Sequence, residues 1–185
     1  LLVSKVSKLL WIAAILVPSE GVESAYAVDS LVSLMRTLGH KRAIMKSDQE
    51  PSIKALRDAA IRDLDREVEI ITEESPVGVS QANGTTEGAV GIIMGLIRTL
   101  RDSVERMFKI EIPYDSALVP WLVLHAAFLY NRFNRITLDG RTPYEQHEGK
   151  TRKCSLPPFG EQVLWQPLGK PKIINKLENR WKEGS

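Results

Sequence analysis

The first half of the chain alternates short apolar runs with segments whose apolar residues recur every three or four positions. The runs of strand length lie at residues 1–3, 8–17, 42–46 and 68–72. Helical spacing marks residues 24–38 and 51–64, with Gly39 placed to end the first helix and Pro51 to begin the second. A turn is expected at residues 4–7. Strands that alternate with amphipathic helices predict a layered α/β domain.

The middle of the chain predicts a loop followed by two longer helices. Proline and glycine break the pattern over residues 73–84, which we expect to form the loop. Residues 85–108 then repeat apolar side chains at helical spacing, and residues 117–132 form a second helix that is almost wholly apolar. We expect this second helix to be buried on most sides. His125 lies within it and is predicted to be a core histidine rather than a ligand.

The last quarter of the chain lacks long periodic segments, because proline and glycine divide it into short pieces. We place a domain boundary near residue 150. Residues 1–150 are the predicted main domain. Residues 151–185 are a predicted linker and the start of a small second unit, with short strands expected at 162–165 and 173–174.

Composition excludes several classes of protein. The chain has 185 residues and one cysteine, Cys154, so it contains neither an internal disulfide framework nor a zinc site built from cysteines. Its longest apolar run, Leu9–Val17, is about half the length that spans a bilayer. A signal peptide is the rival interpretation of this run. A buried strand is favoured, because Pro18-Ser19-Glu20 is a poor cleavage site.

Charge is unevenly distributed along the chain. Residues 131–185 contain 11 Lys and Arg against 6 Asp and Glu, although the whole chain has a formal net charge of only +2. A basic C-terminal segment is compatible with a polyanionic partner. It is equally compatible with a solvated tail that binds nothing.

Two carboxylates stand out by their positions. Asp48 follows a predicted strand and precedes a helix, where ligands gather in open α/β sheets, although it could simply cap that helix. Glu87 lies in the first turn of the predicted helix 85–108, where the helix dipole alone would favour it. Together the two could offer oxygen ligands to a hard divalent cation such as Mg²⁺. The sequence shows no nucleophilic triad and no phosphate-binding glycine loop.

Five segments, in order, resemble the integrase core of copia-type retrotransposon polyproteins. They are the KSDQEP segment at 46–51, ESPVG with SQANGTTE at 74–87, PWLVLHAA with Asn131-Arg132 at 120–132, DGRTPYE at 139–145 and FGE with VLW at 159–165. The similarity runs from about residue 17 to the end of the chain. The ordered set is specific, whereas no single segment would be.

This resemblance implies a ribonuclease-H-like mixed sheet flanked by helices, followed by the start of a small basic β-domain. It also implies an Asp-Asp-Glu site that binds Mg²⁺ or Mn²⁺, in which Asp48 is the second carboxylate and Glu87 the third. The implied activity of the parent protein is DNA integration, by 3′-end processing and strand transfer. The implied setting is a homo-oligomer acting on DNA in the nucleus, with no membrane association.

The resemblance further implies that Lys46, Gln81 and Asn83 face DNA. Basic residues of the C-terminal third are the other candidates for phosphate contacts. They are Arg132, Arg135, Arg141, Lys150, Arg152, Lys153, Lys170 and Lys172.

The chain departs from the family at its N-terminus. The first acidic residue is Glu20, so the first aspartate of the site and the central strand that carries it are absent, and the fold is predicted to be N-terminally truncated. We expect the chain to start inside a longer reading frame. Loss of that strand would leave the strand at 42–46 with an open edge or press it against residues 1–3. We therefore expect no strand transfer by the chain alone. The alternatives are a non-catalytic nucleic-acid-binding remnant and an unrelated α/β interaction domain.

Overall fold

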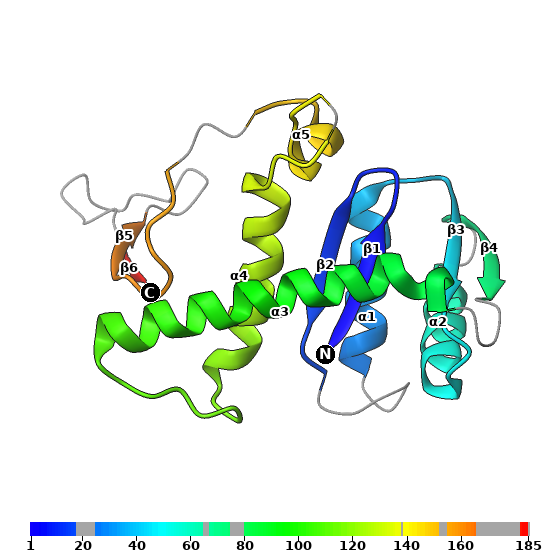
Figure 1. The fold of residues 1–185 in the computed structure, drawn as a ribbon. Coiled ribbons are helices and arrows are strands. Elements are labelled where there is room, and N and C mark those ends of the chain that lie inside the picture. Colours follow the sequence, from blue (N-terminus) through cyan, green and yellow to red (C-terminus); the bar gives the residue numbers. More distant parts are fainter. Residues whose placement is uncertain are drawn as a thin grey trace, which may run out of the picture.

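The computed structural model forms a mixed α/β fold of five helices and three two-stranded sheets within its described residues (Figure 1). These residues are 1–17, 25–64, 67–74, 80–137, 139–151, 155–165 and 182–184. None of the helices in these ranges is long and apolar enough to cross a membrane.

An antiparallel hairpin opens the chain. Strand β1 (Leu2–Val6) pairs with β2 (Trp11–Ile15), and Leu2 lies opposite Ile15. The connecting turn occupies residues 7–10, so the expectation of a turn at residues 4–7 is wrong. This register is the one that buries Ile12 and Ala14, because shifting a strand by one residue would turn the same side chains to the opposite face.

Two helices and a parallel strand pair follow in the predicted order. Helix α1 (Ala25–Leu38) leads to β3 (Arg42–Ser47), and helix α2 (Pro51–Asp63) leads to β4 (Glu69–Glu74). Gly39 adopts a positive φ of 65° after α1, as the sequence predicts for a C-terminal cap. Buried side chains of α1 and of α2 with its C-cap residue pack with half-buried residues in β3 and in or just before β4. They are Val32, Met35, Ala60 and Leu64 with Ala43, Met45, Val68 and Ile70.

Helices α3 (Ser80–Phe108) and α4 (Leu118–Phe133) cover the hairpin. Both contribute small and aliphatic side chains to one core with Ile12 and Ala14. These side chains are Ala89 and Ile93 from α3, and Val123, Ala126 and Ala127 from α4. The most buried face of each helix therefore lies against the hairpin or the other helix.

Two expectations about these helices are wrong. Helix α3 begins at Ser80 rather than Thr85, because extending a long helix by a few residues is inexpensive once it has been nucleated. Helix α4 is not buried on most sides, since the side chains of Trp121 and Leu124 are 64% and 39% exposed. Leu118 and Phe133 are exposed as well, so one side of α4 is left uncovered by the described residues.

Asn131 joins α4 to the edge of β2 that faces away from β1. Its side chain is buried and bonds to Ile12 as the backbone of a neighbouring strand would. The amide nitrogen of Asn131 donates to the Ile12 carbonyl at 2.7 Å, and the amide oxygen accepts from the Ile12 backbone amide at 2.9 Å. Both backbone groups of a buried residue are satisfied by one side chain.

The short helix α5 (Pro143–Glu148) was not predicted, although the sequence contains its signal. Thr142 and Glu145 form a reciprocal capping box, with proline at the first helical position. A hydrogen bond from the Thr142 amide holds the pKa of the Glu145 carboxyl below its usual range. His147 packs against Trp11, with ring centroids 5.7 Å apart, and so ties α5 to the hairpin.

The last described strands are β5 (Val163–Trp165) and β6 (Lys182–Gly184), which pair antiparallel. The first agrees with the predicted strand at 162–165. The second predicted strand, at 173–174, lies outside the described residues. The boundary near residue 150 stays a prediction.

The strands do not form one continuous sheet. Among the described residues, β1 has only β2 as a strand neighbour, and β3 has only β4 (Figure 1). The expectation that β3 has an open edge is therefore confirmed, and β3 is not pressed against residues 1–3.

Replacing Asn131 tests how strongly α4 holds the hairpin. In Asn131→Leu the Ile12 amide and carbonyl lose their partners while staying buried, which we expect to lower the free energy of unfolding by about 2–4 kcal/mol. Urea unfolding followed by circular dichroism measures this change. The exposed neighbour Asn134→Leu is the control, with an expected change within about 0.5 kcal/mol. Equal effects of the two variants would contradict the account.

Candidate functional site

The carboxyl ends of β3 and β4 form the edge that carries Asp48. Ser47 and Glu74 lie opposite each other in the parallel register, and Asp48 follows directly. The Asp48 side chain is exposed, and its Oδ1 accepts a hydrogen bond from the Gln49 amide at 2.7 Å. A carboxylate is thus presented to solvent at a strand end, as the sequence predicts.

The alternative role for Asp48, as the cap of the next helix, is wrong. The N-cap residue of α2 is Glu50, and its side chain makes no capping hydrogen bond. Pro51 at the first helical position removes one of the amides that a cap would satisfy. Helix α2 therefore starts without help from the Asp48 carboxylate.

Arg57 makes a hydrogen bond to the last residue of β3, a role that the sequence analysis did not predict. The residue is only 8% exposed. Its Nη1 donates to the Ser47 hydroxyl at 3.1 Å, and its Nε donates to Asp58 at 3.0 Å. The available signal was its place beside Leu56 on the buried face of α2, where a charged residue requires partners. Arg57 therefore links α2 to the Ser47 side chain, immediately before Asp48.

A second cation lies at the same edge. Lys54 of α2 pairs with Glu74 at the end of β4, with 3.1 Å between Nζ and Oε1. The edge therefore combines carboxylates from both strands with cations from α2, so its charge is mixed rather than purely acidic.

Glu87 lies in the third turn of α3 rather than the first, and its side chain is exposed. The helix dipole acts mainly within the first turn, so the dipole explanation for a carboxylate at this position is wrong. Figure 1 draws the start of α3 on the same side of the molecule as β3 and α2. The convergence of Glu87 with Asp48 stays a prediction.

The exposed surface of α3 also carries glycines at helical spacing. An added Cβ at Gly84, Gly88, Gly91 or Gly95 would meet nothing within 4 Å. Packing within the described residues therefore does not require glycine at these positions, although each interior glycine costs the helix about 1 kcal/mol relative to alanine.

The predicted DNA-facing residues occupy several settings. Lys46 is exposed on β3, opposite Glu73. Arg135 donates to the Gly140 carbonyl at 3.2 Å, and Arg141 pairs with Asp139 at 2.9 Å. Lys150 is exposed after α5. The remaining candidates lie outside the described residues or have undescribed side chains: Gln81, Asn83, Arg152, Lys153, Lys170 and Lys172.

Arg132 is held by aromatic rings. Its guanidinium carbon lies 4.0 Å from the ring centroid of Phe128 and 4.8 Å from that of Tyr144. These cation–π contacts connect α4 to α5. The half-buried guanidinium therefore has a structural role here, besides the phosphate contact predicted from its charge.

His125 packs against two aromatic rings and is half-buried rather than fully in the core. Its ring centroid lies 5.7 Å from Phe128 and 4.9 Å from Phe159. Burial lowers its pKa, because the charged form loses solvation. The contact with Phe159 brings the segment that follows α5 onto α4.

The described residues contain no group of three or more His, Cys, Asp or Glu side chains that could hold a metal ion. Asp48 and Glu87 offer hard oxygen donors suited to Mg²⁺ or Mn²⁺, but they are only two. The donor chemistry fits such an ion, whereas the number of protein ligands falls short of the implied three.

Comparison with known proteins places the fold. No protein-family model matches the chain, and no curated protein matches it. A chain of the simian T-cell lymphotropic virus intasome, solved in complex with PP2A regulatory subunit B56 gamma, matches with a TM-score of 0.55 and 17% identity. The match covers 92% of this chain but 56% of the intasome chain, so the present chain spans about half of its length.

The catalytic core domain of BIV integrase is similar as well. It has a TM-score of 0.51 and 17% identity, with 80% of this chain and 84% of the BIV domain covered. Identity this low supports the fold alone. The chain has the mixed α/β fold of retroviral integrase catalytic cores.

Proposed function

We propose that this chain is the integrase-like domain of a copia-type retrotransposon polyprotein. Its parent protein would process the 3′ ends of element DNA and join them to target DNA, acting as a homo-oligomer in the nucleus. The observation that carries the proposal is the fold, which is similar to integrase catalytic cores over 80% or more of this chain. The ordered segments KSDQEP, SQANGTTE and DGRTPYE support the retrotransposon origin.

Asp48 and Glu87 are the residues proposed to hold the divalent metal. When bound, a metal pair of this kind activates the attacking oxygen and stabilises the leaving oxygen of a phosphodiester. The contribution of this chain is to fix the ligands. Arg57 anchors the strand end before Asp48, and Ala89 and Ile93 anchor α3 against the hairpin near Glu87.

The isolated chain is proposed to be inactive in strand transfer. Two carboxylates leave a cation incompletely anchored, and catalysis of in-line displacement depends on the geometry of the bound ions. Nucleic-acid binding has weaker requirements, because it needs only cations placed against phosphates. A DNA-binding remnant without catalytic activity is therefore the second candidate, and for the chain alone it is the favoured one.

An assay of end joining tests the inactivity. Labelled duplex DNA ends are incubated with the chain and Mg²⁺ or Mn²⁺, and no joined product is expected above the level of Asp48→Asn, Glu87→Gln or a reaction with EDTA. Joining by the wild-type chain that disappears in Asp48→Asn would show that two carboxylates suffice, and would contradict the incomplete-site account.

Salt dependence tests the DNA binding. We expect affinity for duplex DNA to fall steeply between about 50 and 200 mM salt, since released counterions drive phosphate contacts. Fluorescence anisotropy measures this, and Arg141→Ala should reduce the slope of log K against log salt by about 0.9 if Arg141 makes one such contact.

Arg106 on α3 provides a matched control. Like Arg141 it is exposed and paired with an aspartate, here Asp102 at 3.0 Å, but it lies far from the basic C-terminal third in sequence. Arg106→Ala should leave the salt slope unchanged. Affinity that is flat across this salt range would show that phosphate contacts are not the basis of binding.

A further inference from the structure

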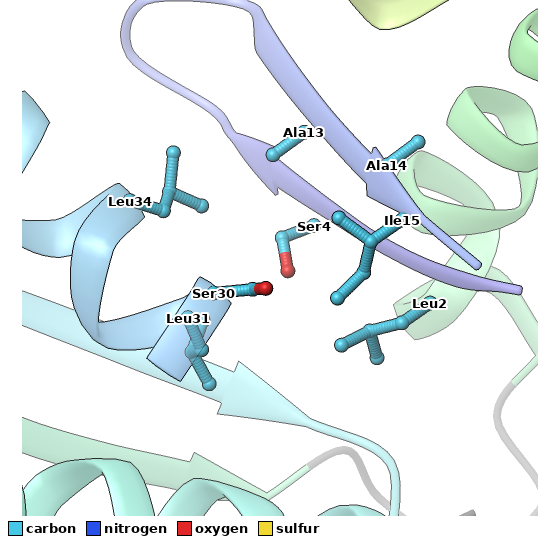
Figure 2. Close-up of a pocket in the computed structure, with 8 residues that line it drawn as sticks. All are labelled: Leu2, Ser4, Ala13, Ala14, Ile15, Ser30, Leu31 and Leu34. Carbon is cyan, nitrogen blue, oxygen red and sulfur yellow. The ribbon is translucent and has the colours of Figure 1, made fainter. Parts of the chain in front are cut away.

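The β3–β4 pair has one covered face and one open face. Helices α1 and α2 cover the first, where Ala43 and Met45 pack with the buried side chains of both helices. Figure 2 shows Leu31 of α1 lining a groove with Leu2 and Ile15 of the hairpin, with β3 running beyond them. Leu31 also packs in the core of the β3–β4 pair. The covered face is therefore occupied by the chain itself, and a partner would have to use the opposite face.

The open face carries a regular pattern of charge around an apolar centre. Alternate residues of β3 lie on it, and the parallel register places alternate residues of β4 beside them. The pairs, in order along the strands, are Arg42 with Glu69, Ile44 with Ile71, and Lys46 with Glu73. The two isoleucines are 63% and 39% exposed, and the four charged residues are exposed as well. Both cations thus lie on β3, and both carboxylates lie on β4.

The interactions within this face leave its groups available to a partner. The Nε atom of Arg42 lies 3.6 Å from Oε1 of Glu69, and the two side chains are 67% and 66% exposed. Exposed ion pairs of this kind contribute little to stability, because water screens them. The branched side chains of Ile44 and Ile71 suit a strand, but removing their apolar surface from water requires a second surface.

A second copy of the chain supplies a complementary surface. In a two-fold dimer the same patch contacts itself. When the two-fold axis runs along the strands, β3 of one copy lies over β4 of the other, in the same order. The facing pairs are then Arg42 with Glu69, Ile44 with Ile71, and Lys46 with Glu73. Each cation has one carboxylate beside it in its own sheet and a second carboxylate across the interface.

Charge selects this axis over the perpendicular one. An axis across the strands would place β3 over β3 in reverse order, so that Arg42 would face Lys46 of the second copy. Such like-charge contacts are strongly unfavourable in an interface. Figure 1 shows β4 on the side of the pair away from the hairpin. With the axis along the strands, the hairpin of each copy therefore lies beyond β4 of the other copy and not between the sheets.

We propose that the open face of the β3–β4 pair is a self-association surface whose partner is a second copy of the chain, related by a two-fold axis along the strands. The two sheets pack about 10 Å apart, with the isoleucines between them and a cluster of four charges at each end. The patch is smaller than a standard interface of about 20–30 residues a side, so the dimer is weak and transient. The proposal does not depend on the metal site or on DNA binding.

Charge reversal tests this surface, with sedimentation velocity at increasing protein concentration as the measurement of dimer. The double variant Arg42→Glu with Lys46→Glu places carboxylates on both strands, and its association constant should fall about tenfold or more. Adding Glu69→Lys and Glu73→Lys inverts the whole pattern. This fourfold variant should associate as the wild type does, because each cation again faces a carboxylate.

A second variant tests the apolar centre without changing any charge. Ile44→Thr keeps a branched side chain on the strand but removes apolar surface, so it should also weaken association. Circular dichroism checks that every variant is folded. The matched control is Arg106→Glu on α3, since Arg106 is likewise exposed and paired with an aspartate. The control should associate as the wild type does.

Mixing the wild type with the fourfold variant determines the axis. An axis along the strands places like charges opposite each other in the mixed dimer, so no mixed dimer should form. A mixed dimer stronger than either homodimer would show the perpendicular axis and overturn the proposal. A wild-type chain that stays monomeric at about 1 mM would overturn it as well. So would an Ile44→Thr variant that associates as the wild type does, or an Arg106→Glu variant as weak as the double variant.

Amide NMR spectra of the same samples locate the contact. Signals of residues 42–46 and 69–73 should shift as the protein concentration rises. Shifts confined to other residues would place the contact elsewhere and overturn the proposal. Lys46 is also a predicted DNA contact. Shifts at residues 42–46 that appear with duplex DNA but not with protein concentration would assign the face to DNA and equally overturn it.

Discussion

Within the described residues, β1 pairs only with β2 and β3 only with β4, and this division into two strand pairs is the constraint on which the rest of the structure depends. The outer edge of the hairpin is closed by Asn131 at Ile12, and β3 is covered on its other side by β4. Each strand pair is then held by its own helices, the hairpin by α3 and α4 and the parallel pair by α1 and α2. Helix α1 borders both, because Leu31 and Leu34 lie beside the hairpin and Leu31 also packs in the core of the parallel pair.

The regular elements could largely be predicted from the sequence, because they depend on local periodicity. The strand at 42–46 and the helices at 24–38 and 51–64 follow from apolar spacing and from Gly39 and Pro51. Some errors arose where tertiary contacts decide, and others at a helix start and a short helix whose signals are local. The register of the hairpin depends on burying Ile12 against α3 and α4, which no local pattern reveals. Helix α5 was not predicted, although its Thr142–Glu145 capping box can be recognised from the sequence.

The site was predicted less completely than the fold. Asp48 could be located because a strand end is a local feature, and the structure places it exposed at that end. Arg57 and Asn131 could not be assigned, because their partners Ser47 and Ile12 come from other elements, 10 and 119 residues away. The dipole argument for Glu87 failed because it rested on where α3 begins, and helix ends are the least certain features of a sequence pattern.

Asp48 and Glu87 are proposed to belong to one divalent-metal site, and the proposed function rests on it. The most direct measurement is paramagnetic broadening of backbone amide NMR signals by Mn²⁺, added in small amounts to the wild-type chain and to Asp48→Asn. If the site is shared, signals of residues 48 and 87 should broaden together, and the substitution should remove the broadening at both. Broadening at only one of them, or broadening at residue 87 that persists in Asp48→Asn, would contradict a shared site.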